Sequence, residues 1–204
     1  ERAHAASRHP VGSRRRRQGS PVTGAVRRGG AALTLAALLI GTSATPSAQS
    51  AAATDLQAAF LLNFARFTQW PASAQRQSIV MCVFDDDRLA RALSLSLRGQ
   101  TIEGRPLQAV NIGADGNVSQ CQVLFVGKSS IGEGMPLLRA ASRLPVLTVS
   151  DRKGFASTAG VVELFVEDGH MRFAVNIDVA RRSQLTLSSR LLKLARIVRG
   201  THAF

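Results

Sequence analysis

Three consecutive acidic residues, Asp85 to Asp87, form the densest group of potential ligands in the sequence. They follow the short apolar run Ser78 to Phe84, which predicts a buried strand. Ligands of open α/β sheets bind beyond the carboxyl ends of strands. Two further loops follow predicted strands in the same way, so a ligand crevice is conceivable at Asp85, Asp87, Lys128, Ser129 and Asp151. We favour a simpler interpretation, in which the aspartates cap the next helix and oppose its N-terminal dipole.

The sequence contains no complete catalytic motif with the required residue spacing. Gly127, Lys128 and Ser129 imitate the end of a phosphate-binding P-loop, but position 122 is Gln where that motif requires Gly. The sequence has no G-x-S-x-G elbow, and after residue 50 its histidines are His170 and His202, without zinc-ligand spacing. We therefore predict no catalytic residue, no metal and no cofactor.

A group of cationic residues lies near the C-terminus. Its members are Arg181, Arg182, Arg190, Lys193 and Arg196. A solvated polar face is the ordinary role of such a charge run. The alternative is a docking patch for an acidic partner or for anionic lipid headgroups. These five residues are our candidates for a partner surface.

The elements that would position these residues can be predicted from periodicity and turn residues. The predicted helices are Asp55 to about Phe67 with Thr54 as N-cap, Asp85 to about Leu97, a helix around Met135 to Ala141, and a closing helix from about Ser188 to Val198. The predicted strands are Ser78 to Phe84, a pair within Thr101 to Ile112 around the turn Glu103-Gly104, Val123 to Val126, Pro145 to Val149, and a hairpin of Val161 to Glu167 and Met171 to Ile177 around Asp168-Gly169.

Strands and helices alternate through the middle of the chain, which indicates an α/β fold. We expect a single domain with a mixed, mostly parallel sheet flanked by helices, a C-terminal β-hairpin and a closing helix. We assign this domain to residues 51–204. No repeat or long linker divides it.

Residues 1–50 are interpreted as a signal peptide with a basic upstream extension, removed or not translated. Arginines precede an apolar run at residues 31–40, which is typical of an export signal. Ten residues span roughly 15 Å of helix, too little to cross a bilayer. Because residue 1 is Glu, a translation start at Val22 or Val26 on an alternative codon would give a signal of ordinary length.

Removal of residues 1–50 on export would lower the net charge of the protein. The whole chain has a formal net charge of +13, but eight of its 26 Lys and Arg and one of its 13 Asp and Glu precede residue 51. The remainder has eighteen cations and twelve anions, a net charge of +6. No basic strip interleaved with aromatic residues is left there, so we expect no nucleic-acid partner.

Cys82 and Cys121 are the only cysteines. An even number in an exported protein favours a disulfide. The alternative is two separate buried thiols that act as small hydrophobic groups. We expect the disulfide, which would restrict the unfolded chain by roughly 4 kcal/mol.

From Asp55 to Val198 the chain resembles the YfiR family of periplasmic proteins. The resemblance rests on AAFLLNFARFTQWP (Ala58 to Pro71), CVFDDD (Cys82 to Asp87), PVLTVSDRKGFA (Pro145 to Ala156) and VNIDVARRSQLTLSSRLLKLARIV (Val175 to Val198). Cys82 and Cys121 match one cysteine pair of that family. A second pair, found in some members, would fall around Ala156 and Glu163 and is missing here.

The resemblance implies a periplasmic regulator that is not an enzyme. Such a protein represses a membrane-anchored diguanylate cyclase by binding its periplasmic part, which lowers cyclic di-GMP signalling and biofilm formation. The implied partners are the periplasmic domain of an inner-membrane diguanylate cyclase or sensor kinase and an outer-membrane lipoprotein, and a homodimer is a further expectation. The alternative function is a periplasmic small-molecule sensor that uses the predicted crevice, and an unrecognised enzyme is the least favoured.

Overall fold

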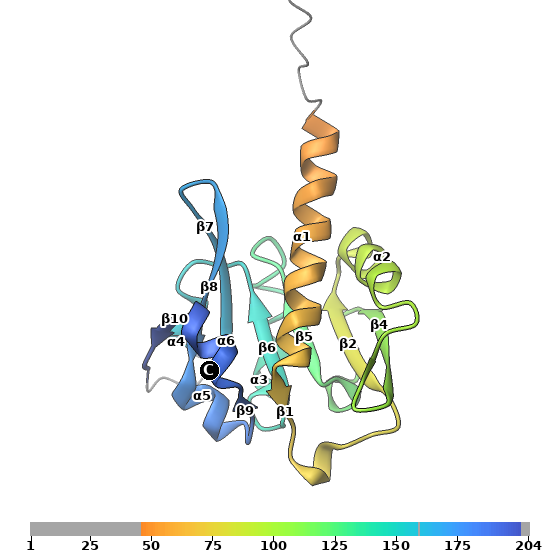
Figure 1. The fold of residues 1–204 in the computed structure, drawn as a ribbon, viewed down its shortest axis with the longest axis vertical. Coiled ribbons are helices and arrows are strands. Elements are labelled where there is room, and N and C mark those ends of the chain that lie inside the picture. The colour runs from red at the N-terminus through yellow and green to blue at the C-terminus, as the bar shows by residue number, and fades with distance from the viewer. Residues whose placement is uncertain (1–45, 159, 201–204) are drawn as a thin grey trace, which may run out of the picture. The chain divides into compact units, whose positions relative to one another are not determined.

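The computed structural model describes residues 46–158 and 160–200. Its helices are α1 (Pro46–Arg66), α2 (Asp87–Ser96), α3 (Met135–Ala141), α4 (Phe155–Thr158), α5 (Ile177–Arg182) and α6 (Ser189–Leu194) (Figure 1). Its strands are β1 (Thr68–Gln69), β2 (Ile79–Phe84), β3 (Thr101–Ile102), β4 (Arg105–Ile112), β5 (Val123–Val126), β6 (Leu147–Ser150), β7 (Val162–Glu167), β8 (His170–Asn176), β9 (Thr186–Leu187) and β10 (Arg196–Val198). Two short 3-10 turns complete the described part, η1 (Ala72–Ala74) and η2 (Val118–Gln120).

The main sheet of the described residues has eight strands in the order β10-β8-β7-β6-β5-β2-β4-β3. Strands β4, β2, β5, β6 and β7 run parallel to one another. Strand β8 is antiparallel to β7, and β3 is antiparallel to β4. From β2 the chain first adds β4 on one side and then returns to add β5 on the other, so the winding reverses between β2 and β5. This doubly wound arrangement confirms the predicted α/β fold with a mixed, mostly parallel sheet.

Helices cover both faces of the sheet because its central strands are apolar on both sides. Along β2, Met81 and Val83 belong to the core that includes α1 and α2, whereas Cys82 and Phe84 belong to the core that includes α3 and α4. This alternation is the two-residue period of a strand buried on both faces. The prediction of a buried strand at residues 78–84 is therefore confirmed.

Helix α1 is attached to the C-terminal part of the chain. Phe60 and Phe64 of α1 and Phe173 of β8 form a cluster of three rings, with centroids 5.1 to 6.0 Å apart. Just beyond α1, the short strand β1 pairs with β9 in a separate two-stranded ribbon, in which Thr68 lies opposite Leu187. Segments near the beginning and near the end of the described chain thus pack together.

Both predicted hairpins are present. Strands β7 and β8 flank Asp168 and Gly169, whose φ angles are 51° and 73°. Strands β3 and β4 flank Glu103 and Gly104 in the same way. Positive φ at both central residues is the requirement of the two-residue turn that the Asp-Gly pair predicted.

The predicted start of the first helix is wrong. Helix α1 begins at Pro46, so Thr54 lies inside it and its hydroxyl donates a hydrogen bond to the Ser50 carbonyl, four residues earlier, at 3.1 Å. A Ser or Thr hydroxyl inside a helix commonly donates its hydrogen bond to the carbonyl four residues earlier. The helix ends at Arg66, which confirms the predicted end at about Phe67. Most of the predicted targeting segment, residues 1–45, lies outside the described residues, so its role stays a prediction.

The predicted closing helix is wrong beyond Leu194. Helix α6 ends there, and residues 196–198 form β10, which pairs with β8 in parallel. The leucines continue a helical pattern, but backbone pairing at the open edge of β8 replaces it. Helices α4 and α5 and the β1–β9 ribbon were not predicted, because elements of two to six residues carry too little periodicity.

The predicted disulfide is present. Cys82 of β2 and Cys121, just before β5, are bonded with their Cα atoms 5.7 Å apart, within the usual range for a disulfide. Both residues are buried against α3, with exposures of 1% and 2%. The bridge joins the two strands between which the winding reverses.

Candidate interaction surface

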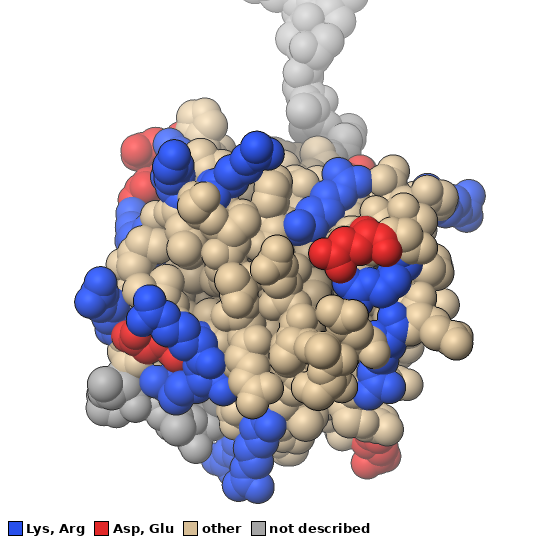
Figure 2. Space-filling model, turned by 60° about the horizontal axis from the view of Figure 1, so that its bottom comes forward, with Lys and Arg blue, Asp and Glu red and all other residues tan. Residues whose placement is uncertain are grey.

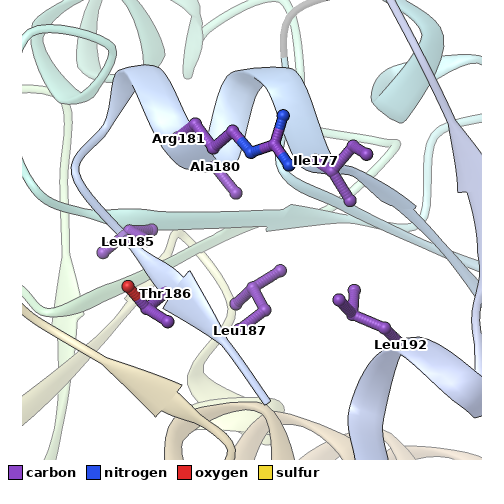
Figure 3. Close-up of a pocket in the computed structure, with 7 residues that line it drawn as sticks. All are labelled: Ile177, Ala180, Arg181, Leu185, Thr186, Leu187 and Leu192. Atoms are coloured by element: carbon purple, nitrogen blue, oxygen red, sulfur yellow. The ribbon is translucent and has the colours of Figure 1, made fainter. Parts of the chain in front are cut away.

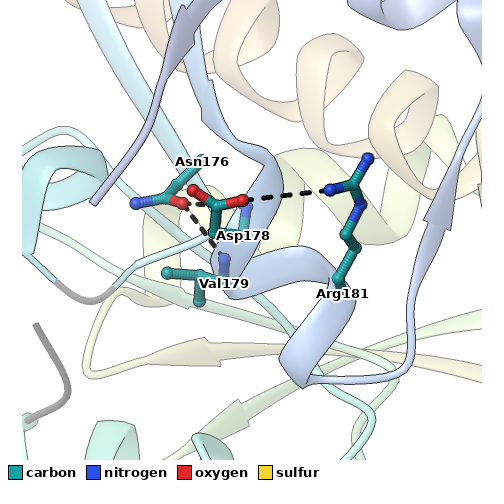
Figure 4. Close-up of polar contacts among 4 residues, drawn as sticks. All are labelled: Asn176, Asp178, Val179 and Arg181. Carbon is teal, nitrogen blue, oxygen red and sulfur yellow. Dashed lines mark hydrogen bonds and ion pairs between the residues drawn. The ribbon is translucent and has the colours of Figure 1, made fainter. Parts of the chain in front are cut away.

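A buried asparagine organises the C-terminal end of the sheet (Figure 4). The Asn176 side-chain oxygen accepts hydrogen bonds from the backbone N–H groups of Asp178, at 3.1 Å, and Val179, at 3.0 Å. Its amide nitrogen donates to the Ala156 carbonyl at 2.7 Å. Asn176 therefore caps α5 and ties it to α4. The residue is completely buried, so these bonds have no competition from water.

An apolar cavity of about 260 Å³ opens between α5, β9 and α6 (Figure 3). Its lining consists of Ile177, Ala180, Arg181, Leu185, Thr186, Leu187 and Leu192. Arg181 contributes the charge of this lining, and its side chain is 76% exposed. The Arg181 guanidinium lies 4.0 Å from the Asp178 carboxylate, which is a weak contact at the surface (Figure 4). The cavity thus combines aliphatic walls with a cation on its lining.

Further cations stand on the two helices that line this cavity. Arg182 of α5 and Arg190 and Lys193 of α6 are all exposed. Within the described part of the chain, none of these three side chains has an ion-pair partner. Cationic side chains also predominate on the face drawn in Figure 2, with few anionic ones between them. Four of the five residues predicted as a partner surface therefore lie on one pair of short helices.

Arg196, the fifth predicted residue, is engaged within the domain. Its guanidinium forms an ion pair with Glu167 and lies over the Phe165 ring, 4.6 Å from the centroid. Both partners belong to β7. Arg196 thus attaches the edge strand β10 to the β7–β8 hairpin, and part of its charge is already neutralised.

We define the cationic surface as Arg181, Arg182, Arg190 and Lys193 together with the cavity between α5, β9 and α6. Exposed apolar groups lie beside it, since Leu194 is 76% exposed and Ile197 is 43% exposed. An apolar hollow with cations around it is suited to bind an apolar side chain flanked by carboxylates.

The residues of the predicted crevice lie at one end of the sheet, where the parallel strands have their carboxyl ends. Asp85, Lys128 and Asp151 follow β2, β5 and β6, which are neighbouring parallel strands. The carboxyl ends of β2 and β5 mark the point where the winding reverses, the usual ligand position in such sheets. The three loops therefore lie at the same end of the sheet, and a ligand crevice between them stays a prediction.

Most of these polar groups have partners within the domain. The Asp86 carboxylate accepts a hydrogen bond from the Leu89 N–H at 2.9 Å, so it caps α2 as the simpler interpretation predicted. The Asp87 carboxylate accepts from the Asn111 side chain at 2.7 Å. The Lys128 N–H donates to the Asp151 carboxylate at 2.6 Å, which joins two of the loops. Asp85 and Ser129 are exposed.

Sequence reasoning did not identify Glu163 as a structural carboxylate. Its side chain, on β7, accepts hydrogen bonds from the backbone N–H groups of Gly154, at 3.0 Å, and Ala156, at 3.1 Å. Ala156 and Glu163 are the positions at which some YfiR-family members are expected to carry a second cysteine pair. In this chain a hydrogen bond joins the same two positions.

Residues 46–158 and 160–200 hold no group of three or more His, Cys, Asp or Glu side chains placed to bind a metal ion. Over the same residues, no helix has both the length and the apolar character that a bilayer crossing requires.

Strand order and surface together define a doubly wound α/β domain with an apolar hollow that Arg181 lines, between two helices that carry further exposed cations. The chain belongs to the YfiR/HmsC-like family, whose model matches residues 54–196. No curated protein shows significant similarity to it. At the level of the family, membership supports a periplasmic regulator of diguanylate cyclase signalling, with a regulatory rather than a catalytic role.

Proposed function

We propose that this chain represses a membrane-anchored diguanylate cyclase or a similar sensor by binding its periplasmic part through the cationic surface. Binding that favours an inactive state of the partner is sufficient for repression, because a ligand shifts a conformational equilibrium by its difference in affinity for the two states. Such a mechanism needs a docking surface and no catalytic group.

The observation that carries this proposal is the set of unpaired cations on the two helices that line the apolar cavity. Arg182, Arg190 and Lys193 are exposed and have no ion-pair partner among the described residues. Their side chains remain available for carboxylates of a partner, which would accelerate association through long-range attraction. An apolar side chain of the partner, seated against Leu187 and Leu192, would supply affinity that does not depend on salt.

Charge reversal on α5 and α6 tests the proposal. The triple variant Arg182→Glu, Arg190→Glu and Lys193→Glu should weaken binding to the isolated periplasmic part of the partner cyclase by at least about a hundredfold. Most of the loss should appear in the association rate, and it should shrink as salt is added. Biolayer interferometry at several salt concentrations measures both quantities.

A matched control separates this surface from net charge. Arg139 and Arg143 are exposed residues at α3, on the opposite face of the sheet. Replacement of Arg139, Arg143 and the exposed Arg152 by Glu changes the net charge by the same amount as the triple variant on α5 and α6. Equal losses in the two triple variants would contradict the proposed surface. In cells, deletion of the gene should raise cyclic di-GMP, and the control variant but not the α5–α6 variant should restore its level.

A second candidate function is a small-molecule sensor whose ligand would bind at the carboxyl ends of β2, β5 and β6. The position of this edge at the reversal of winding favours it. Asp85, Lys128 and Ser129 would then contact the ligand directly. The two functions are compatible, since a ligand at this edge could alter affinity at the cationic surface.

A thermal-shift screen of amino acids, nucleotides and vitamins tests the sensor function. A ligand at a hundred times its dissociation constant should stabilise the domain by about 2.7 kcal/mol. The double variant Asp85→Ala and Lys128→Ala should abolish the shift. A ligand whose shift persists in that variant binds elsewhere, which would argue against this edge.

A further inference from the structure

The two ends of the main sheet differ in charge. Strands β4, β2, β5 and β6 run in the same direction, so the segments that precede them meet at one end, which we call the amino end. The segments that follow them meet at the carboxyl end, where the chain places Asp85, Asp87 and Asp151. The amino end comes forward in Figure 2, and cationic side chains predominate on it.

Four exposed arginines lie at the amino end. Arg76 precedes β2, and Arg143 precedes β6. Arg66 is the last residue of α1, from which the chain continues to β2, and Arg98 follows α2, which returns from the carboxyl end of β2 toward the start of β4. We call these four residues the arginine face. They come from four separate segments, so the charge is spread across the end of the domain.

Hydrogen bonds between neighbouring segments hold two of these side chains in place. The Arg66 guanidinium donates to the Gln100 side-chain oxygen, which joins the ends of α1 and α2. The Arg76 guanidinium donates to the Ser119 carbonyl at 2.8 Å, which joins the segments that precede β2 and β5. Both acceptors are neutral, so these bonds orient the guanidinium groups without neutralising their charge.

The arginine face keeps its charge. Within residues 46–158 and 160–200, none of its four members has an ion-pair partner. Glu103, in the turn before β4, is already paired with Arg105 at 2.8 Å. Asp178 of α5 lies 4.0 Å from Arg181. Cations that no carboxylate neutralises produce a positive potential over the surface that carries them.

An anionic phospholipid bilayer matches this distribution of charge. A guanidinium group can donate two parallel hydrogen bonds to a phosphate, and a bilayer presents phosphates side by side over an area wider than the domain. Arginines on four separate segments can each reach one of them. A protein partner would need carboxylates fixed at four matching points, whereas lipids move laterally to meet the cations.

We propose that the arginine face docks the domain reversibly on the surface of an anionic phospholipid bilayer. In this orientation the carboxyl end points away from the lipid, because it lies at the other end of the same strands. The loops after β2, β5 and β6 then stay open to water. The arginine face shares no residue with the cationic surface, so this proposal does not rest on the proposed function.

Co-sedimentation with lipid vesicles tests the proposal on the chain purified from a periplasmic extract. The wild-type chain should bind vesicles of phosphatidylcholine and phosphatidylglycerol in equal parts, and binding should weaken as salt is added. Vesicles of phosphatidylcholine alone should leave it in solution. The triple variant Arg76→Glu, Arg98→Glu and Arg143→Glu should lower the partition coefficient at least about a hundredfold, from about fivefold for each cation near an anionic surface.

A matched control changes the carboxyl end. Lys128→Glu, Arg152→Glu and Lys153→Glu alter the net charge by the same amount at three exposed positions. The two ends of the six-residue strand β2 lie roughly 20 Å apart, which exceeds the Debye length of about 8 Å at physiological salt. The control variant should therefore bind the anionic vesicles within about threefold of the wild-type chain.

A charge-conserving variant separates charge from folding. Arg76→Lys, Arg98→Lys and Arg143→Lys together should retain most of the vesicle binding, because the lysines keep the positive potential of the arginine face. Circular dichroism should show native folding in all three triple variants.

Two results would overturn the proposal, namely a wild-type chain that does not bind the anionic vesicles and equal losses in the two Glu variants. If the wild-type chain ignored vesicles while the arginine-face Glu variant lost binding to the partner's periplasmic part, the face would belong to an acidic protein and the lipid proposal would fail. The proposed function is measured without lipid and with the arginine face intact, so failure of that function and failure of lipid docking give different results.

Discussion

The β4 end of the sheet consists of long, regular elements, whereas the C-terminal end consists of short ones. Strand β4 has eight residues and α2 has ten, and the disulfide ties β2, the neighbour of β4, to the segment just before β5. At the C-terminal end, no helix or strand from α5 to β10 exceeds six residues. Buried polar side chains hold that end together, chiefly Asn176 and Glu163.

The two regions differ in what fixes their shape. Regular elements fix a surface through a repetitive backbone that does not depend on particular side chains. Short segments joined by capping groups present side chains from several directions, which suits a shaped hollow with charges around it. The first arrangement should tolerate single side-chain changes, and the second should not.

Removal of the disulfide has the largest expected effect, because the bond restricts the unfolded chain between β2 and the segment before β5. The double variant Cys82→Ala and Cys121→Ala should lower the free energy of unfolding by up to about 4 kcal/mol, since the bond closes a sequence separation of 39 residues. Urea denaturation with and without reductant measures this loss. Reductant should leave the variant itself unaffected, and an unchanged midpoint for the reduced wild-type chain would contradict the prediction.

Asn176→Ala should have the next largest effect, about 3 kcal/mol, because it removes a helix cap and leaves the buried Ala156 carbonyl without its partner. The matched control is Asn111→Ala at the β4 end, whose side chain is exposed. That control should lower stability by less than about 1 kcal/mol. If denaturant unfolding showed equal losses of unfolding free energy in the two variants, the proposed difference between the two ends of the sheet would be contradicted.

Glu163→Ala should destabilise the domain by about 2 kcal/mol, because the backbone N–H groups of half-buried Gly154 and buried Ala156 lose their acceptor. Hydrogen exchange should accelerate first at the amides of Gly154 and Ala156. Glu167→Ala, a carboxylate lost from the exposed tip of the same strand, should change stability by less than about 1 kcal/mol. Slow exchange at both amides in the Glu163 variant would show that another group accepts their hydrogen bonds.

Arg196→Ala should have the smallest effect, about 0.5 to 1 kcal/mol, because its ion pair with Glu167 and its contact with Phe165 lie at the surface. A double-mutant cycle with Phe165→Leu isolates the second contact. A coupling energy near zero would mean that Arg196 does not attach β10 to the hairpin.

The same contrast explains what the sequence could predict. Strand β2, β5 and the Asp168-Gly169 hairpin carry patterns that act within a few residues, so their positions were predicted well. The loops that follow β2, β5 and β6 could be placed on one edge because parallel strands share direction. The C-terminal segments depend instead on partners far along the chain. Nothing in the local pattern indicates that β10 will pair with β8.

The candidate site was predicted in part for the same reason. The run of cations was visible as composition, and four of its members proved to lie on the two helices beside the cavity. The cavity itself was not predictable, because Ile177, Leu187 and Leu192 lie on three short elements, α5, β9 and α6, whose mutual packing no local pattern specifies. The engagement of Arg196 by Glu167 is likewise a tertiary contact.

The β1–β9 ribbon and the ring cluster of Phe60, Phe64 and Phe173 also affect how the chain acquires its fold. During synthesis α1 is made first, yet its packing partners in β8 and β9 are among the last elements completed. Contacts of such long sequence separation slow folding, since the intervening loop must close before they form. Until then the phenylalanines of α1 stay exposed, which makes the nascent chain a substrate for chaperones.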